Sequence, residues 1–189
     1  MPSTSFRRRV LARAAVPLTA AVMATGVAAV MATPAAASNS YNGNAYISGT
    51  GNPYDDFNDE GALNTSTNAV SNATCLWQSI LVADGYLDNT VYEIDGSFGA
   101  KTRDATESWQ SNHGLDDDGS VGKLTFKKVA EIGLIVKSQN DDGSATAVYD
   151  GWAMTLQLKR ATNGRWSFLN ERNDKWYTAS YNTRTCPNP

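Results

Sequence analysis

The sequence contains few of the residues on which catalytic and metal centres most often depend. Among its 189 residues there is one histidine, His113, and there are two cysteines, Cys75 and Cys186. A zinc site needs three or four His, Cys or acidic ligands, so we expect no metal, and nothing in the sequence points to a cofactor. No nucleophile-elbow motif accompanies the histidine, which argues against a Ser–His–Asp hydrolase. We therefore predict no enzyme activity, and a glycosidase built on paired carboxylates stays open as an alternative.

Long apolar runs are also scarce. One run extends from Ala14 to Ala32, after a positively charged start that contains four arginines, and it precedes the small residues Ala35-Ala36-Ala37. This order is typical of a cleaved secretory signal, so we predict a signal peptide at residues 1–37 and a mature chain beginning near Ser38, with an uncleaved membrane anchor as the alternative. The pair Arg7-Arg8 leaves both the Sec and the twin-arginine export routes open. No second run is long enough to span a bilayer, so we expect a secreted protein, extracellular or associated with the cell wall, and no membrane after cleavage.

Positive charge is scarce in the predicted mature chain. The full sequence has 16 Lys and Arg against 19 Asp and Glu. Removing the four signal-peptide arginines leaves 12 against 19, a net charge of −7. Binding to nucleic acid depends on Lys and Arg that neutralise phosphates, so we expect no nucleic-acid partner.

An oxidising destination favours a disulfide between Cys75 and Cys186. The bond would close a loop of about 110 residues, which is worth roughly 4–5 kcal/mol in the chain-entropy account. Two unpaired thiols are the alternative.

Residues 38–74 are rich in Asn, Gly, Ser and Thr, and their few apolar residues show no period. We predict a poorly ordered polar arm with one short strand around residues 45–47. Its acids do not have the spacing of a calcium loop, so we interpret them as a solvated acidic turn; they are Asp55, Asp56, Asp59 and Glu60.

From Cys75 onward the apolar residues recur at helical spacing and predict a helical domain over residues 75–135. Its helices run from Cys75 towards Gly85, from Ala100 to Asn112, and from Lys123 to about Glu131, with Leu124 and Ile132 near the inner side of the third. The predicted core contains Leu76, Ile80, Leu81, Phe98, Ala105, Trp109, Val121 and Val129.

Two loops between these helices repeat each other. Residues 95–99 read Asp-Gly-Ser-Phe-Gly and residues 118–122 read Asp-Gly-Ser-Val-Gly, an offset of 23 residues. In each loop the aspartate can fix the turn through backbone hydrogen bonds, and the apolar residue before the second glycine can point inward as an anchor.

Over residues 144–186 the period changes to two, which predicts a small antiparallel sheet of three or four strands. Alternation from Trp152 to Lys159 places Trp152 on the buried side of one strand, and Asn163-Gly164 predicts a hairpin to the next. Trp166 and Phe168 should then point inward together. Aromatic residues on these strands can stack on sugars, although a buried sheet face is the more common use of such residues.

The middle of the chain resembles the peptidoglycan-binding domain that is fused to bacterial wall hydrolases. The resemblance covers about 60 residues in order and spacing: Trp77-Gln78-x-x-Leu81, Gly85-Tyr86, residues 94–102, Ala105, Trp109-Gln110, Gly114-Leu115, residues 118–122 and Thr125. It implies a three-helix bundle that binds the wall polymer or its stem peptide in a shallow groove. Together with the sheet, this predicts the α+β class.

Polar residues near the first loop are the candidate contacts, because sugars and peptides need hydrogen-bonding groups beside an aromatic face. The candidates are Tyr86, Asp95, Ser97, Lys101, Thr102, Arg103 and Gln110. For each of them a purely structural role is the alternative. We predict a secreted, non-catalytic peptidoglycan-binding protein. The second hypothesis is an inhibitor or adaptor whose sheet binds a secreted protein, which an exposed aromatic patch on the sheet would favour.

Overall fold

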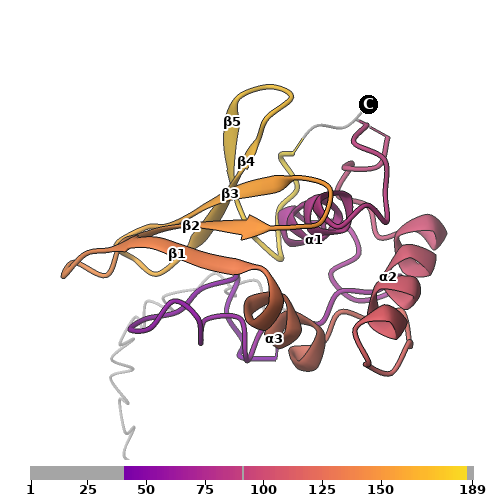
Figure 1. Ribbon diagram of the computed structural model, residues 1–189, viewed down its shortest axis with the longest axis horizontal. Helices are drawn as coiled ribbons and strands as arrows, with labels where there is room; N and C mark the ends of the chain where they lie inside the picture. The colour runs from indigo at the N-terminus through magenta and orange to yellow at the C-terminus, as the bar shows by residue number, and fades with distance from the viewer. Residues whose placement is uncertain (1–40, 91, 187–189) are drawn as a thin grey trace, which may run out of the picture. The chain divides into compact units, whose positions relative to one another are not determined.

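The computed structural model describes residues 41–90 and 92–186. The predicted signal peptide and the predicted start at Ser38 lie outside the described residues. Three helices and a five-stranded antiparallel sheet make up the regular structure of the described part (Figure 1). This confirms the predicted α+β class.

The helices follow the order predicted from the apolar spacing. They are α1, Asn72–Ala83, α2, Ala100–Asn112, and α3, Lys123–Ile132. Helix α1 begins three residues before the predicted start, because the Ser71 side chain accepts a hydrogen bond from the Thr74 N–H at 3.0 Å and caps the helix.

The predicted helical core is confirmed. All eight residues expected there are buried, including Phe98 and Val121, the two apolar loop anchors. Leu124 and Ile132 are exposed, contrary to the expectation for α3, because its buried face is formed by Phe126, Val129 and their neighbours.

The sequence predicted three or four strands, and the sheet has five. Its strands pair in sequence order, each antiparallel to the next: β1, Leu134–Gln139, β2, Ala145–Asp150, β3, Thr155–Arg160, β4, Trp166–Asn170, and β5, Lys175–Thr178. Strand β1 was missed, because it directly follows α3 and its own burial shows no regular alternation. The hairpin at Asn163-Gly164 is confirmed, and Gly164 has the positive φ of +81° that such a turn requires.

One prediction about the sheet is wrong. Alternating burial begins only at Thr155, and Trp152 lies in the turn before β3 with 90% of its surface exposed. The apolar alternation of the sequence continues through this turn, so periodicity alone could not locate the start of the strand. Trp166 and Phe168 do point inward and are fully buried.

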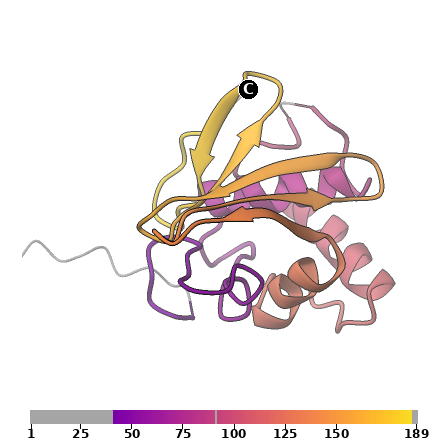
Figure 2. The same ribbon diagram turned by 60° about the vertical axis from the view of Figure 1, so that its left-hand side comes forward.

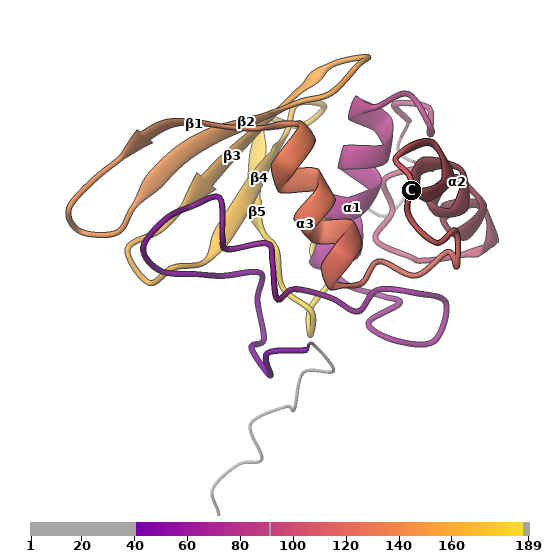
Figure 3. The same cartoon turned by 60° about the horizontal axis from the view of Figure 1, so that its bottom comes forward.

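Helix α1 is the centre of the packing. It lies between α2 and the sheet, where it contacts β2, β3 and β5 (Figure 3). All twelve of its residues are buried. A single cluster of buried residues runs from the helices into the sheet, so the two regions share one core.

The segment before α1 is packed and not a poorly ordered arm, at least from residue 41. It lies on the same side of the sheet as α3 (Figure 2), and its Ile47, Phe57 and Leu63 are fully buried in the common core. The short strand predicted around residues 45–47 appears as two isolated bridges, Tyr46 with Ser180 and Ser48 with Arg165. The division of the chain into an arm, a helical domain and a sheet stays a prediction.

Candidate functional site

The first repeated loop is organised around the buried side chain of Gln78. Its Nε2 lies within 3.1 Å of Asp95 Oδ1, the Ser97 carbonyl and Thr102 Oγ1, while its Oε1 accepts a hydrogen bond from Gly96 N at 2.8 Å. The amide of one α1 residue therefore holds both the loop and the start of α2.

The second loop repeats this arrangement atom for atom. Gln110 Nε2 lies within 3.1 Å of Asp118 Oδ1, the Ser120 carbonyl and Thr125 Oγ1, and its Oε1 accepts from Gly119 N at 2.9 Å. The internal repeat thus includes the glutamine of each Trp-Gln pair, 77–78 and 109–110. The role of Gln78 was not predicted from the sequence, although the recurrence of Trp-Gln before each loop was a signal for it.

This scaffold decides where several predicted contact residues lie. Thr102 and Gln110 are buried, and Asp95 has its Oδ1 occupied by Gln78 Nε2 and by the Ser97 N–H at 2.8 Å. Ser97 is half-buried in the same loop. Asp95, Ser97 and Thr102 are therefore brought together as supports of the first loop, whereas Gln110 supports the second.

The other predicted residues lie nearer to solvent. Tyr86 and Lys101 line a hollow of about 240 Å³ between the end of α1 and the start of α2; the remaining lining residues are Leu87, Asp104, Ala105 and Ser108. Lys101 pairs with Glu93, and hydrogen bonding to that carboxylate raises the pKa of Lys101. The hollow therefore combines an aromatic ring with one amine and one carboxylate, which suits a polar ligand.

Arg103 is exposed beside this hollow and faces the second loop. Its guanidinium pairs with Asp104 at 2.6 Å and with Glu107 at 3.4 Å, and hydrogen bonding to Asp104 raises the pKa of Arg103. Its stem packs so closely on Gly119 that a Cβ there would lie 2.7 Å from Arg103 Cγ. A second hollow, of about 380 Å³, is lined by residues of that loop and its neighbours, among them Tyr41, Gln110, Leu115, Asp118, Lys123 and Leu124.

The carboxylate of Asp84, at the end of α1, joins the helices to the sheet. Its Oδ2 accepts hydrogen bonds from Trp109 Nε1 and from the Tyr149 hydroxyl, each at 2.6 Å. Burial, followed by the contact with Asp84, raises the pKa of Tyr149 well above its usual range, so this hydroxyl stays a donor. The end of α1 is thereby held in one position relative to α2 and β2.

The predicted disulfide joins Cys75 to Cys186 and fastens the end of the described chain to α1. The Cα atoms of the two cysteines are 6.6 Å apart. Gly96 of the first loop packs directly on the bond, since a Cβ there would lie 2.6 Å from Cys75 Sγ. The positive φ of Gly96, +72°, also favours glycine. The disulfide therefore packs against the first loop and supports it at Gly96.

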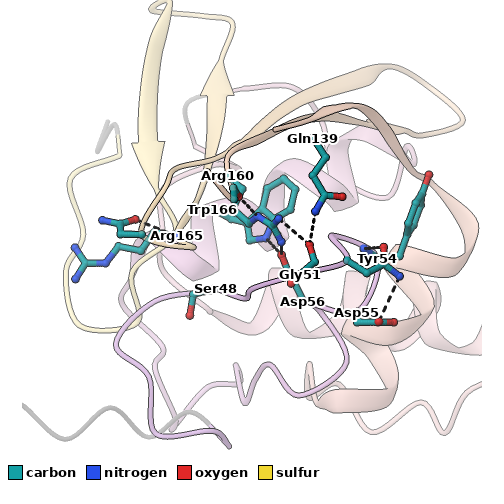
Figure 4. A network of polar contacts seen from close by, with 12 residues as sticks. Ser48, Gly51, Tyr54, Asp55, Asp56, Gln139, Arg160, Arg165 and Trp166 are labelled. Carbon is teal, nitrogen blue, oxygen red and sulfur yellow. Dashed lines mark hydrogen bonds and ion pairs between the residues drawn. The ribbon is translucent and has the colours of Figure 1, made fainter. Parts of the chain in front are cut away.

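The prediction of a solvated acidic turn is wrong for two of its four acids, because Asp56 and Glu60 are buried, while Asp55 and Asp59 are exposed. Asp56 is buried and pairs with Arg160 Nη1 at 2.6 Å, while it accepts a hydrogen bond from Trp166 Nε1 at 2.8 Å (Figure 4). Burial raises the pKa of Asp56, and the contacts with Arg160 and Trp166 oppose that rise. Arg160 also donates to the Gly51 carbonyl at 2.9 Å, so the pair connects the N-terminal segment to β3.

Glu60 is likewise buried and bonded. Its Oε2 accepts from the Tyr181 hydroxyl at 2.6 Å, and its Oε1 accepts from Ser48 N at 2.9 Å. Burial raises the pKa of Glu60 to about 7, although these hydrogen bonds favour the charged form. The network binds the N-terminal segment to the residues after β5. Neither pair was predicted from the sequence, because Arg160 lies 104 residues from Asp56 and Tyr181 lies 121 residues from Glu60.

Residues 72–129 match the family model described as "Putative peptidoglycan binding domain". This confirms the resemblance inferred from the motifs. The match begins at the first residue of α1, ends within α3, and contains both glutamine-centred loops. The chain matches no curated protein and no solved structure. The N-terminal segment and the whole sheet lie outside the matched residues.

Among the described residues, no helix has the length and apolar character to cross a membrane. In the same part of the chain, no cluster of His, Cys, Asp and Glu has the arrangement to hold a metal ion.

Proposed function

We propose that this protein is secreted and binds bacterial cell-wall peptidoglycan without cleaving it. The match of residues 72–129 to a peptidoglycan-binding family carries the proposal. The glutamine-centred loops support it, because they give the matched region a rigid frame on which exposed side chains can be positioned. The disulfide supports secretion, since such bonds persist in oxidising compartments.

The binding surface we propose is the 240 Å³ hollow between α1 and α2. Tyr86 and Lys101 line it, and Arg103 lies at its side. These three provide the direct contacts. The other four predicted residues have an indirect role, because they fix the loops and the start of α2: Asp95, Ser97, Thr102 and Gln110. A wall stem peptide, with its amide groups and carboxylates, has the hydrogen-bonding groups that such a surface can satisfy.

The hypothesis of a protein-binding sheet has less support. An exposed aromatic patch on the sheet would favour it, but on the strands Trp166 and Tyr149 are buried and Trp176 is 38% exposed. The largely exposed Trp152 lies off the strands, in the turn between β2 and β3. Lys159 moreover lies 4.0 Å from the centre of the Trp176 ring and covers part of it.

The non-catalytic part of the proposal rests on how the buried acids are used. A glycosidase needs two carboxylates free to act across a cleft. A polar hollow of about 480 Å³ is lined by Asp55, Asp56 and Asp59, but the Asp56 carboxylate is occupied by Arg160 and Trp166. Asp56, the buried acid of this hollow, therefore has a structural role.

Co-sedimentation of residues 38–189 with purified insoluble peptidoglycan tests the proposal. We expect the wild type in the pellet and a Tyr86→Ala/Arg103→Ala variant in the supernatant, because two direct contacts are lost from an exposed surface. The matched control is Tyr54→Ala/Arg172→Ala, which removes the same two residue types from exposed positions outside the hollow.

Release of soluble wall fragments is measured in the same tubes, and we expect none above a protein-free blank. A wild-type protein that stays in solution contradicts the binding proposal, and time-dependent release of fragments contradicts the non-catalytic one. Equal sedimentation of both double variants would place the binding surface elsewhere.

A further inference from the structure

Trp152 differs from the other tryptophans in contributing almost nothing to the core. Trp77, Trp109 and Trp166 are fully buried, whereas Trp152 exposes 90% of its surface in the turn between β2 and β3. Burial of an aromatic ring is among the largest single contributions to folding, and this ring does not supply it. Large aromatic side chains that stay exposed are characteristic of binding surfaces.

The turn that carries Trp152 is held rigidly on the end of α1. Ala153 N and Met154 N both donate to the Ala83 carbonyl, at 2.7 and 3.1 Å, and Trp152 N donates to Asp84 Oδ1 at 3.3 Å. A Cβ at Gly151 would overlap the same Ala83 carbonyl, so only glycine allows this approach. An exposed ring on a fixed backbone loses little conformational freedom on binding, which is what a preformed contact requires.

The ring also extends the proposed binding surface. A Cβ at Gly85 would lie 3.3 Å from Trp152 Cε3, so the indole lies against Gly85, the residue directly before Tyr86. Tyr86 lines the hollow between α1 and α2. The sheet therefore places an aromatic side chain beside a surface that otherwise comes from the matched residues 72–129.

Small residues adjoin the ring, and one carboxylate lies near it. Gly85, Gly151 and Ala153 adjoin it, and the nearby Asp84 carboxylate already accepts three hydrogen bonds, from Trp152 N, Trp109 and Tyr149. None of these four residues carries a positive charge, so they offer the carboxylates of a stem peptide no ionic partner. The C–H face of a pyranose ring needs only the open face of an aromatic ring, so the site fits an uncharged sugar.

We propose that Trp152 is a sugar-stacking residue that binds one pyranose ring of the glycan strand, next to the hollow that receives the peptide. This inference rests on the proposed function and gives the sheet a part in it. It also assigns separate parts of the wall polymer to separate parts of the protein: the peptide to the hollow and the glycan to the β2–β3 turn.

The experiment compares residues 38–189 as wild type, Trp152→Ala and Trp152→Phe, with Trp176→Ala as the matched control. The probes are intact insoluble peptidoglycan and glycan strands from which the stem peptides have been removed. We expect Trp152→Ala to lose about tenfold in affinity for the glycan strands, Trp152→Phe to retain most of it, and Trp176→Ala to match the wild type. Tryptophan fluorescence should respond to the glycan in the wild type and not in Trp152→Ala, because three of the other four indoles are fully buried.

The outcomes separate this inference from the proposed function. Wild type that fails to bind intact peptidoglycan overturns both. Wild type that binds intact peptidoglycan but not the glycan strands, or a Trp152→Ala variant that binds the strands as tightly as the wild type, overturns the stacking role alone. Circular dichroism and thermal unfolding of Trp152→Ala should match the wild type, since so exposed a side chain contributes little to stability.

Discussion

Removal of the Asp56 carboxylate should destabilise the protein strongly. In an Asp56→Ala variant the guanidinium of Arg160, whose side chain is fully buried, loses its ionic partner. The indole N–H of Trp166 loses its acceptor as well. Two carbonyls, of Gly51 and Gly143, still accept from Arg160 at 2.9 Å, but neither carries a charge. Breaking a buried ion pair on one side typically costs about 3–5 kcal/mol, and we expect a loss in that range.

The assay is urea unfolding of residues 38–189 with the disulfide intact, followed by circular dichroism. Asp55→Ala is the control, because the Asp55 carboxylate is exposed, and we expect a change of about 0.5 kcal/mol or less for it. An Asp56→Ala/Arg160→Met variant should lose less than the two single variants combined, since no unpaired charge is left in the core. A loss below about 1 kcal/mol for Asp56→Ala, on the scale of an exposed ion pair, would refute the reasoning.

Two further predictions concern the other links between distant segments. Burial raises the pKa of Glu60 to about 7 from its ordinary 4.5, so the folded state binds a proton more tightly than the unfolded state. The free energy of unfolding should therefore be unaffected by the ionisation of Glu60 below pH 4.5 and should fall as the pH rises to about 7, by at most about 3 kcal/mol. The Glu60→Gln variant should show a flatter pH dependence in urea unfolding measured from about pH 4 to 8. A slope that is unchanged in Glu60→Gln would assign the pH dependence to other groups. Loss of the disulfide in Cys75→Ala/Cys186→Ala should lower the free energy of unfolding by about 4–5 kcal/mol, given the sequence separation of 111 residues. Reductant should destabilise the wild type and leave this variant unchanged, and equal sensitivity of the two would contradict the assignment.

Much of the helical region could be predicted from the sequence. Local signals suffice there: apolar residues at helical spacing, and the repeated Asp-Gly-Ser loops between the helices. The family resemblance follows from the same residues, because the loops and the helix faces are encoded over about 60 consecutive positions. The disulfide could be expected because only one pairing of two cysteines exists.

The sequence could not show which polar residues are supports and which are free to bind. Asp95, Thr102 and Gln110 look like surface contacts when the chain is read in order, but their partners come from another helix or loop. These hydrogen-bond partners are 8 to 24 residues away, too far for a helical or strand period in the sequence to reveal them. The same holds for Asp56 and Glu60, whose local sequence is that of an acidic loop.

The sequence by itself determined the helices, their loops and the family resemblance of residues 72–129, because those features depend mostly on neighbours close along the chain. The tertiary structure decided the fate of the side chains whose partners are distant. It buried Asp56 against Arg160, 104 residues away, and it exposed Trp152 although the sequence pattern placed that residue inside. The physical reason is common to both: burial depends on which segments meet in space, and that is settled only when the sheet, α1 and the N-terminal segment close around one core.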